Sequence, residues 1–126
     1  MRSFTRRTGR RGERRIMGKL VYGGLGVVVD CDDRFLAHAQ LVIEQKLRRH
    51  ETFLFSWPDD ASVGSGRSTL FLHNAISLAF RYTDSRRVEI NHVWLRLLTE
   101  SANSASGLLY LPEPGARPLP LPRGHL

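Results

Sequence analysis

The sequence predicts a single α+β domain in which two helices cover one face of an antiparallel sheet of five to six strands. Segments of alternating apolar residues are typical of strands, and two longer segments carry apolar residues at helical spacing. The connections between linked strands are short enough for antiparallel pairing. The chain has 126 residues, of which 41% are hydrophobic and 25% are charged, as expected for one globular domain. The predicted order of elements is ββαβββαβ.

The first half of the chain predicts a hairpin followed by a long helix. Residues 19–23 and 27–31 have strand patterns and flank the glycine-rich turn 24–26, which suits a tight hairpin. Asp32 or Asp33 then offers a side-chain oxygen to cap a helix. Its apolar positions are Phe35, Leu36, Ala39, Val42, Ile43 and Leu47, and the basic residues Lys46, Arg48 and Arg49 mark its end.

The second half predicts three strands, a second helix and a last short strand. Phe53, Phe55 and Trp57 alternate along one face of a strand, and Asn91 offers the side chain of a helix cap. Gly107 suits the end of that helix. The elements are strands at 52–57, 68–73 and 76–83, a helix from about 91 to 107, and a strand at 108–111.

The first 16 residues form a strongly basic arm. Seven arginines and one glutamate give it a net charge of +6, out of +7 for the whole chain. Such a composition is typical of a disordered tail that binds polyanions, nucleic acid included, through counterion release. The alternative is that residues 1–16 are an extension upstream of the true start at Met17, where strand pattern begins. Beyond the arm, the domain is nearly neutral.

The other end of the chain is rich in proline. Five prolines fall within residues 112–126, which favours an extended, disordered tail. The pattern of this tail resembles a polyproline recognition peptide. The globular domain is therefore predicted to span residues 17–111.

The residue types present exclude several classes of protein. Cys31 is the single cysteine, which excludes an intramolecular disulfide and favours a cytoplasmic location. We expect no membrane partner, because no stretch has the pattern of a secretory signal or the length of a membrane span. No two of the five histidines have the i, i+4 spacing of a helix-borne zinc pair. We therefore predict no catalytic residue, no metal site and no cofactor.

The glycine-rich segment 62–68 is the strongest local candidate for a binding site. Its glycines allow backbone N–H groups to turn inward, and its serine and arginine side chains supply donors for an anion. A nucleotide-binding P-loop has a lysine and a helix after its last glycine, whereas Arg67 leads into a strand. The alternative is a flexible hairpin loop. The predicted anion- or partner-binding residues are Ser62, Gly64, Ser65, Gly66, Arg67, His73 and Arg81.

Several short motifs are similar to those of a known family. They are Met17-Gly18-Lys19-Leu20, Asp32-Asp33-Arg34, Lys46-Leu47-Arg48-Arg49, Phe55-Ser56-Trp57, Ser62-Val63-Gly64-Ser65-Gly66-Arg67-Ser68 and Ser101-Ala102-Asn103-Ser104. Over about residues 17–114, the chain resembles a family of small uncharacterised actinobacterial proteins with a domain of unknown function. Many members carry the inherited product name ATP-dependent DNA ligase, which would imply ATP as a cofactor.

The ligase name can be compared with the lysines of this chain. An ATP-dependent ligase stores AMP on the lysine of a K-x-D-G motif. Lys19 and Lys46 are the two lysines, and neither begins that motif. We therefore expect a small cytoplasmic binding module for an anionic partner. The alternatives are a ligase-like or ligase-accessory protein, and a protein that oligomerises through an exposed edge strand. The sequence leaves the partner and the oligomeric state open.

Overall fold

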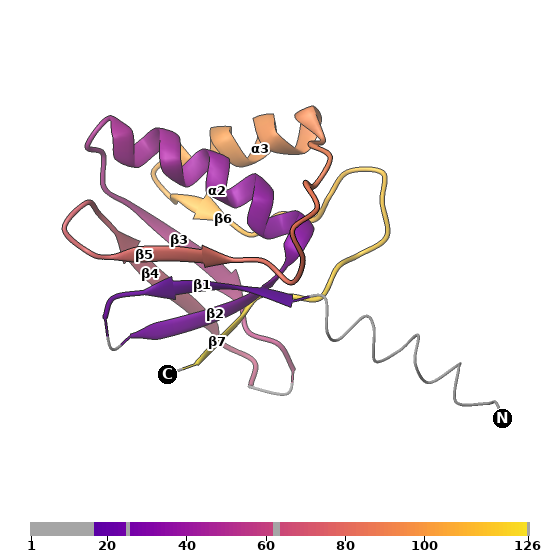
Figure 1. Ribbon diagram of the computed structural model, residues 1–126, viewed down its shortest axis with the longest axis horizontal. Coiled ribbons are helices and arrows are strands. Elements are labelled where there is room, and N and C mark those ends of the chain that lie inside the picture. Colours follow the sequence, from indigo (N-terminus) through magenta and orange to yellow (C-terminus); the bar gives the residue numbers. More distant parts are fainter. Residues whose placement is uncertain (1–16, 25, 62–63, 126) are drawn as a thin grey trace, which may run out of the picture.

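The computed structural model describes residues 17–24, 26–61 and 64–125. Seven strands and two helices are found in this part of the chain (Figure 1). In chain order they are β1 (Met17–Tyr22), β2 (Val27–Asp32), α2 (Asp33–Arg48), β3 (Phe53–Pro58), β4 (Arg67–Leu72), β5 (Leu78–Arg81), α3 (His92–Ala102), β6 (Leu108–Leu109) and β7 (Arg123–His125). The α+β class with two helices is confirmed.

The strands form two sheets, so the prediction of one sheet of five to six strands is wrong. One sheet has the order β5-β1-β2-β7 and the other the order β4-β3-β6. The pairing of β6 with β3 is parallel, and the other pairings are antiparallel. After β4 the chain crosses to the other sheet, where Gly23 donates its backbone N–H to the Ser77 carbonyl (2.8 Å). The alternation of apolar residues predicts which face of a strand is buried, but not which other strand pairs with it.

Both helices begin at the residues that the sequence predicts. The Asp32 carboxylate accepts the backbone N–H of Arg34 (2.8 Å) at the start of α2, as an N-cap does. Asn91 caps α3 in the same way. The second helix ends at Ala102, before the predicted end at Gly107. Gly107 has a φ of +79° and instead turns the chain into β6.

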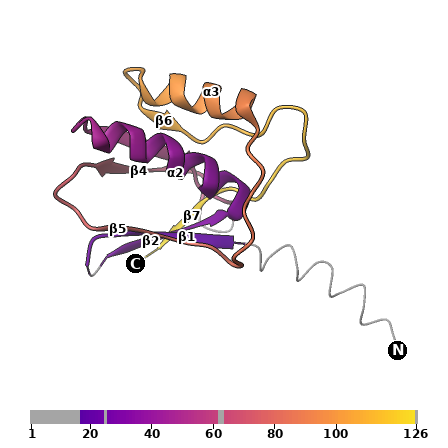
Figure 2. The ribbon, with the colours of Figure 1, turned by 45° about the horizontal axis from the view of Figure 1, so that its top comes forward.

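The helices lie side by side above the strands (Figures 1 and 2). Phe35 of α2 is central, because its ring contacts Phe55 of β3 (6.0 Å between centroids) and Trp94 of α3 (6.0 Å). Tyr110 packs against the same ring at 4.8 Å. Aromatic side chains from both helices and the three-stranded sheet therefore share one core.

The proline-rich segment is more ordered than the sequence suggests. It leaves β6, loops outward and returns beneath the strands to form β7 on the edge of β2 (Figure 1). Pro122 is buried, and Gly124 faces the Trp57 ring. The prediction that this tail is disordered is therefore wrong for β7. Proline presets an extended backbone, and here the extended segment pairs with the edge of β2.

Candidate functional site

The hairpin loop between β3 and β4 contains most of the predicted anion-binding residues. Ser62 lies outside the described residues. Gly64 donates its backbone N–H to the Asp60 carbonyl (3.2 Å), and Asp59 donates its own to the Gly66 carbonyl (2.9 Å). Ser65, Gly66 and Arg67 are exposed. The described backbone of this loop therefore bonds mainly to itself.

A carboxylate also lies where the loop was expected to receive an anion. Asp59 accepts a hydrogen bond from the Ser68 hydroxyl (2.7 Å). Its other carboxylate oxygen is 3.3 Å from the position that a Cβ on Gly66 would take. Because like charges repel, this carboxylate opposes the binding of an anion beside Gly66.

The structure does not bring the remaining predicted residues to the loop. Arg67 begins β4 and His73 follows its end, so the two lie about 20 Å apart at the rise of an extended strand. His73 instead packs on the Phe71 ring at 5.8 Å. Arg81 ends β5, in the other sheet. A full strand therefore separates His73 from the loop.

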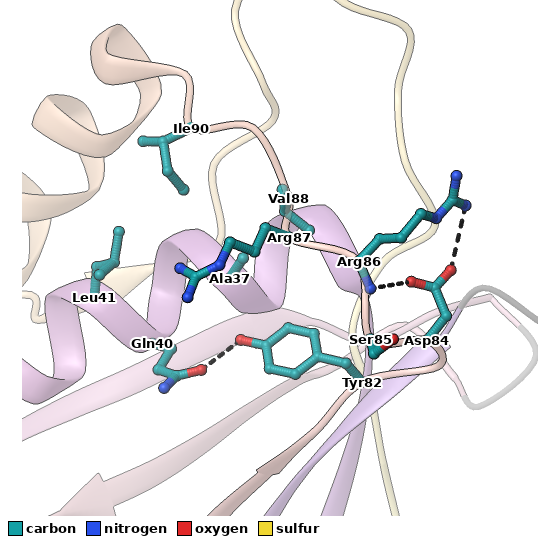
Figure 3. A pocket seen from close by; sticks show the side chains of 10 residues that line it. All are labelled: Ala37, Gln40, Leu41, Tyr82, Asp84, Ser85, Arg86, Arg87, Val88 and Ile90. Atoms are coloured by element: carbon teal, nitrogen blue, oxygen red, sulfur yellow. Dashed lines mark hydrogen bonds and ion pairs between the residues drawn. The ribbon is translucent and has the colours of Figure 1, made fainter.

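A pocket of about 540 Å³ lies between α2 and the segment 82–90 (Figure 3). We call it the α2 pocket. The helix supplies one wall, and the segment that leads from β5 to α3 supplies the other. Its volume is typical of small-molecule sites. The lining residues are Ala37, Gln40, Leu41, Tyr82, Asp84, Ser85, Arg86, Arg87, Val88 and Ile90.

Hydrogen bonds to the first turn of α2 fix both ends of the segment 82–90. The buried Asp33 carboxylate accepts the Thr83 backbone N–H (3.1 Å) and the Thr83 hydroxyl (2.6 Å). At the other end, Arg34 donates to the Glu89 carbonyl (3.2 Å). The outer wall of the pocket is therefore attached to the helix that forms its inner wall.

The polar group on the floor of the pocket is a neutral phenol. Tyr82 donates its hydroxyl to Oε1 of Gln40 (2.5 Å). Burial raises the pKa of Tyr82 to about 12, and the nearby Asp33 and Glu44 carboxylates act in the same direction. The hydroxyl therefore keeps its proton at neutral pH and orients the Gln40 amide.

The two arginines at the mouth differ in their partners. Arg86 pairs with the Asp84 carboxylate (3.3 Å) and points away from the pocket (Figure 3). Arg87 extends toward α2, over Ala37 and Gln40 (Figure 3). Within the described part of the chain, the Arg87 guanidinium has no hydrogen bond or ion pair. A free cation therefore lies over a pocket with largely apolar walls.

A second hollow of about 310 Å³ adjoins the α2 pocket. Asp33 and Thr83 line it, and it shares Asp84, Arg86 and Arg87 with the α2 pocket. Residues of the turn 84–87 therefore line both hollows.

Both lysines of the chain are held in ion pairs. Nζ of Lys19 is 2.8 Å from the Asp30 carboxylate, at the surface of β1. Lys46 is buried, and its Nζ lies 2.9 Å from the Glu51 carboxylate and donates to the Asn103 amide oxygen (2.9 Å). Neither amine lines the α2 pocket. Among the described residues, no group of three or more His, Cys, Asp or Glu side chains is placed to hold a metal ion.

Residues 17–113 match the model of a domain of unknown function, DUF7882. The chain belongs to this family. Neither a curated protein nor a solved structure matches this chain. The DUF7882 region contains both helices and the whole α2 pocket, and it ends before β7. No described helix is both long and apolar enough to cross a membrane.

The sequence does not reveal the α2 pocket because residues 84–87 lie in the connection between the predicted strand at 76–83 and the predicted second helix. In the structure this connection contains a turn, since Asp84 accepts the Arg86 backbone N–H (2.8 Å). The missed signal is the pair Val88 and Ile90, two apolar residues outside any predicted element. In the structure both residues line the α2 pocket opposite residues of α2.

Proposed function

We propose that this DUF7882 domain is a binding module for an anionic ligand with an apolar body, and that the ligand binds in the α2 pocket. The observation that carries the proposal is the Arg87 guanidinium, which lies over the pocket without a partner among the described residues (Figure 3). An arginine fork matches the geometry of a carboxylate, sulfonate or phosphate group.

The walls of the pocket support an apolar ligand body. Leu41 remains 37% exposed on α2, and Val88 and Ile90 face it from the other wall. Covering such side chains with an apolar group is favourable in proportion to the area buried. Gln40 and Tyr82 add a small polar surface that can orient the ligand.

The proposal places anion recognition at the α2 pocket instead of the hairpin loop. Arg67 in the loop also lacks a partner among the described residues, but Asp59 contributes a carboxylate at its base. At the pocket, the carboxylate of Asp84 is already paired with Arg86, which leaves Arg87 as the free charge.

The ligase alternative receives no support from the lysines. A nucleophilic lysine must be free to attack a phosphorus atom. Lys19 and Lys46 are each paired with a carboxylate, and neither lies in the α2 pocket. We therefore propose binding without adenylation.

Two fluorescent probes with the same aromatic body test the proposal. Anilinonaphthalene sulfonate carries an anionic group, and phenylnaphthylamine lacks it. We expect Arg87→Ala to weaken sulfonate binding by about tenfold or more, because a hydrogen bond to a charged group is lost. Binding of the neutral probe should change by less than twofold.

Two further variants locate the binding. Arg96→Ala removes an exposed arginine of α3 outside the pocket, so binding of both probes should be unchanged. Ala37→Phe fills the pocket from α2 and should weaken both probes. Sulfonate binding that survives Arg87→Ala unchanged in a folded protein would contradict the proposal.

A further inference from the structure

Strand β7 covers the edge of β2 with three residues from the end of the chain. It pairs antiparallel with β2 and completes the four-stranded sheet. Without β7, the backbone N–H and C=O groups on that side of β2 would have no strand partner. The cross-strand pairs are Val28 with His125, Val29 with Gly124, and Asp30 with Arg123.

The middle position of β7 is occupied by Gly124, because the Trp57 ring leaves little space for a side chain there. A Cβ on Gly124 would lie 3.0 Å from Cζ2 of Trp57. That ring cannot easily move, because Trp57 is 2% exposed and packs on Phe55 at 4.9 Å. A larger side chain at this position would therefore lift the strand away from β2.

The flanking positions of β7 lie beside the Asp30 carboxylate. Arg123 lies across the strands from Asp30, and Nε2 of His125 is 3.2 Å from the same carboxylate. Pro122, the residue before these three, is buried. The edge of β2 therefore fits a segment with proline, arginine, glycine and histidine in that order.

The acceptor edge and the covering strand belong to different parts of the chain. Strand β2 and Trp57 lie within residues 17–113, which match the DUF7882 model, whereas β7 lies beyond them. The connection before β7 is a long proline-rich segment, and Arg123 and His125 are exposed. A strand of three residues makes few bonds to hold it in place.

We propose that the β2 edge is a binding site for an extended segment of a partner protein with the pattern Pro–Arg–Gly–His, and that β7 occupies this site within the chain. The partner segment would displace β7 and add a strand to the sheet, so that main-chain hydrogen bonds supply affinity and Trp57 and Asp30 supply specificity. This site is separate from the α2 pocket, so neither proposal depends on the other.

A labelled peptide with the sequence of residues 112–125 tests the proposal by fluorescence anisotropy with the full chain. In the wild-type chain, β7 competes at an effective concentration of about millimolar, so the peptide should bind weakly. Gly124→Val in the chain prevents β7 from seating and should raise peptide affinity at least tenfold. The control Ala116→Val changes an exposed residue outside β7 and should leave the affinity unchanged.

The result that overturns the proposal is a folded Gly124→Val chain that binds the peptide no better than wild type. A peptide that itself carries Gly124→Val and binds equally well would also overturn it.

Hydrogen exchange of the wild-type chain gives a test that needs no variant. The amides of β7 should exchange at least ten times faster than those between β1 and β2, and equal protection would show that β7 is a fixed part of the sheet.

Discussion

Asn91 donates its backbone N–H to Nε2 of the completely buried His38 side chain (2.9 Å). Nδ1 of the same ring lies 2.6 Å from the carbonyl oxygen of Arg34. Since a carbonyl can only accept, Nδ1 carries the proton and the ring is neutral. One imidazole therefore connects α2 with the residue that caps α3, and it makes both bonds only in this protonation state.

This neutral ring predicts a loss of stability in mild acid. Burial lowers the pKa of His38 from its ordinary value of 6.5. The unfolded chain binds a proton near pH 6.5 and the folded chain only at lower pH. The free energy of unfolding should therefore fall as the pH drops below about 6.5, by at most about 1.4 kcal/mol per pH unit. Urea denaturation between pH 7.5 and about 5 measures this slope.

The variant His38→Gln isolates the contribution of the ring. It should be less stable than wild type at pH 7.5 and show a smaller slope. Glu113 does not affect the slope in this pH range. Its hydrogen bonds with Arg34 lower its pKa below the ordinary 4.5, so its contribution to the free energy of unfolding is lost only at more acid pH. Equal slopes for the variant and the wild type would contradict the assignment to His38.

Glu113 attaches the segment after β6 to both helices. Its carboxylate accepts two hydrogen bonds from Arg34 (3.0 and 2.6 Å) and one from the Asn91 amide (2.9 Å). We expect Glu113→Gln to lower the free energy of unfolding by about 1.5–3 kcal/mol, the range for hydrogen bonds to charged groups. Thermal or urea unfolding at pH 7 measures the change.

The ion pair between Arg96 and Glu100 provides a matched control. Both side chains are exposed, and they are 3.9 Å apart on α3. Glu100→Gln should therefore cost less than about 0.5 kcal/mol. If the two glutamine variants were equally stable, Glu113 would not have the anchoring role that its contacts indicate.

Gly107 and Gly115 separate the effect of backbone angle from the effect of contact. Their φ angles are similar, +79° and +75°. A Cβ on Gly107 would lie 2.5 Å from the Leu54 carbonyl oxygen, whereas nothing lies within 4 Å of a Cβ on Gly115. Both alanine variants carry the left-handed penalty of about 1–2 kcal/mol. Gly107→Ala should cost at least about 1 kcal/mol more because of the overlap, as measured by urea unfolding.

Local patterns account for what the sequence predicts correctly about the fold. Asp32 and Asn91 mark the helix starts because their side chains bond to nearby backbone N–H groups. The division into two sheets depends on contacts distant in sequence, such as the pairing of Leu20 with Phe80. No local pattern encodes such a pairing, so the sequence predicts the strands without their neighbours.

The candidate site shows the same limit. The glycines and Arg67 are recognisable in sequence because they are adjacent, yet their loop contains Asp59 at its base. The α2 pocket joins residues about 45 positions apart, Leu41 and Arg86 among them. Their proximity follows from the bond between Asp33 and Thr83, which only the structure shows.

Asp84→Asn should change ligand affinity in the direction opposite to Arg87→Ala. The Asp84 carboxylate pairs with Arg86 and lines the α2 pocket. The variant Asp84→Asn keeps the side-chain oxygen that accepts the Arg86 backbone N–H, so the turn should be preserved. It removes a negative charge at the mouth and frees a second guanidinium. Sulfonate-probe affinity should rise by about twofold to fivefold at low salt, because exposed charges interact weakly in water. The gain should disappear at high salt, where such interactions are screened. A loss of affinity in Asp84→Asn would mean that the arginines at the mouth do not attract the anion.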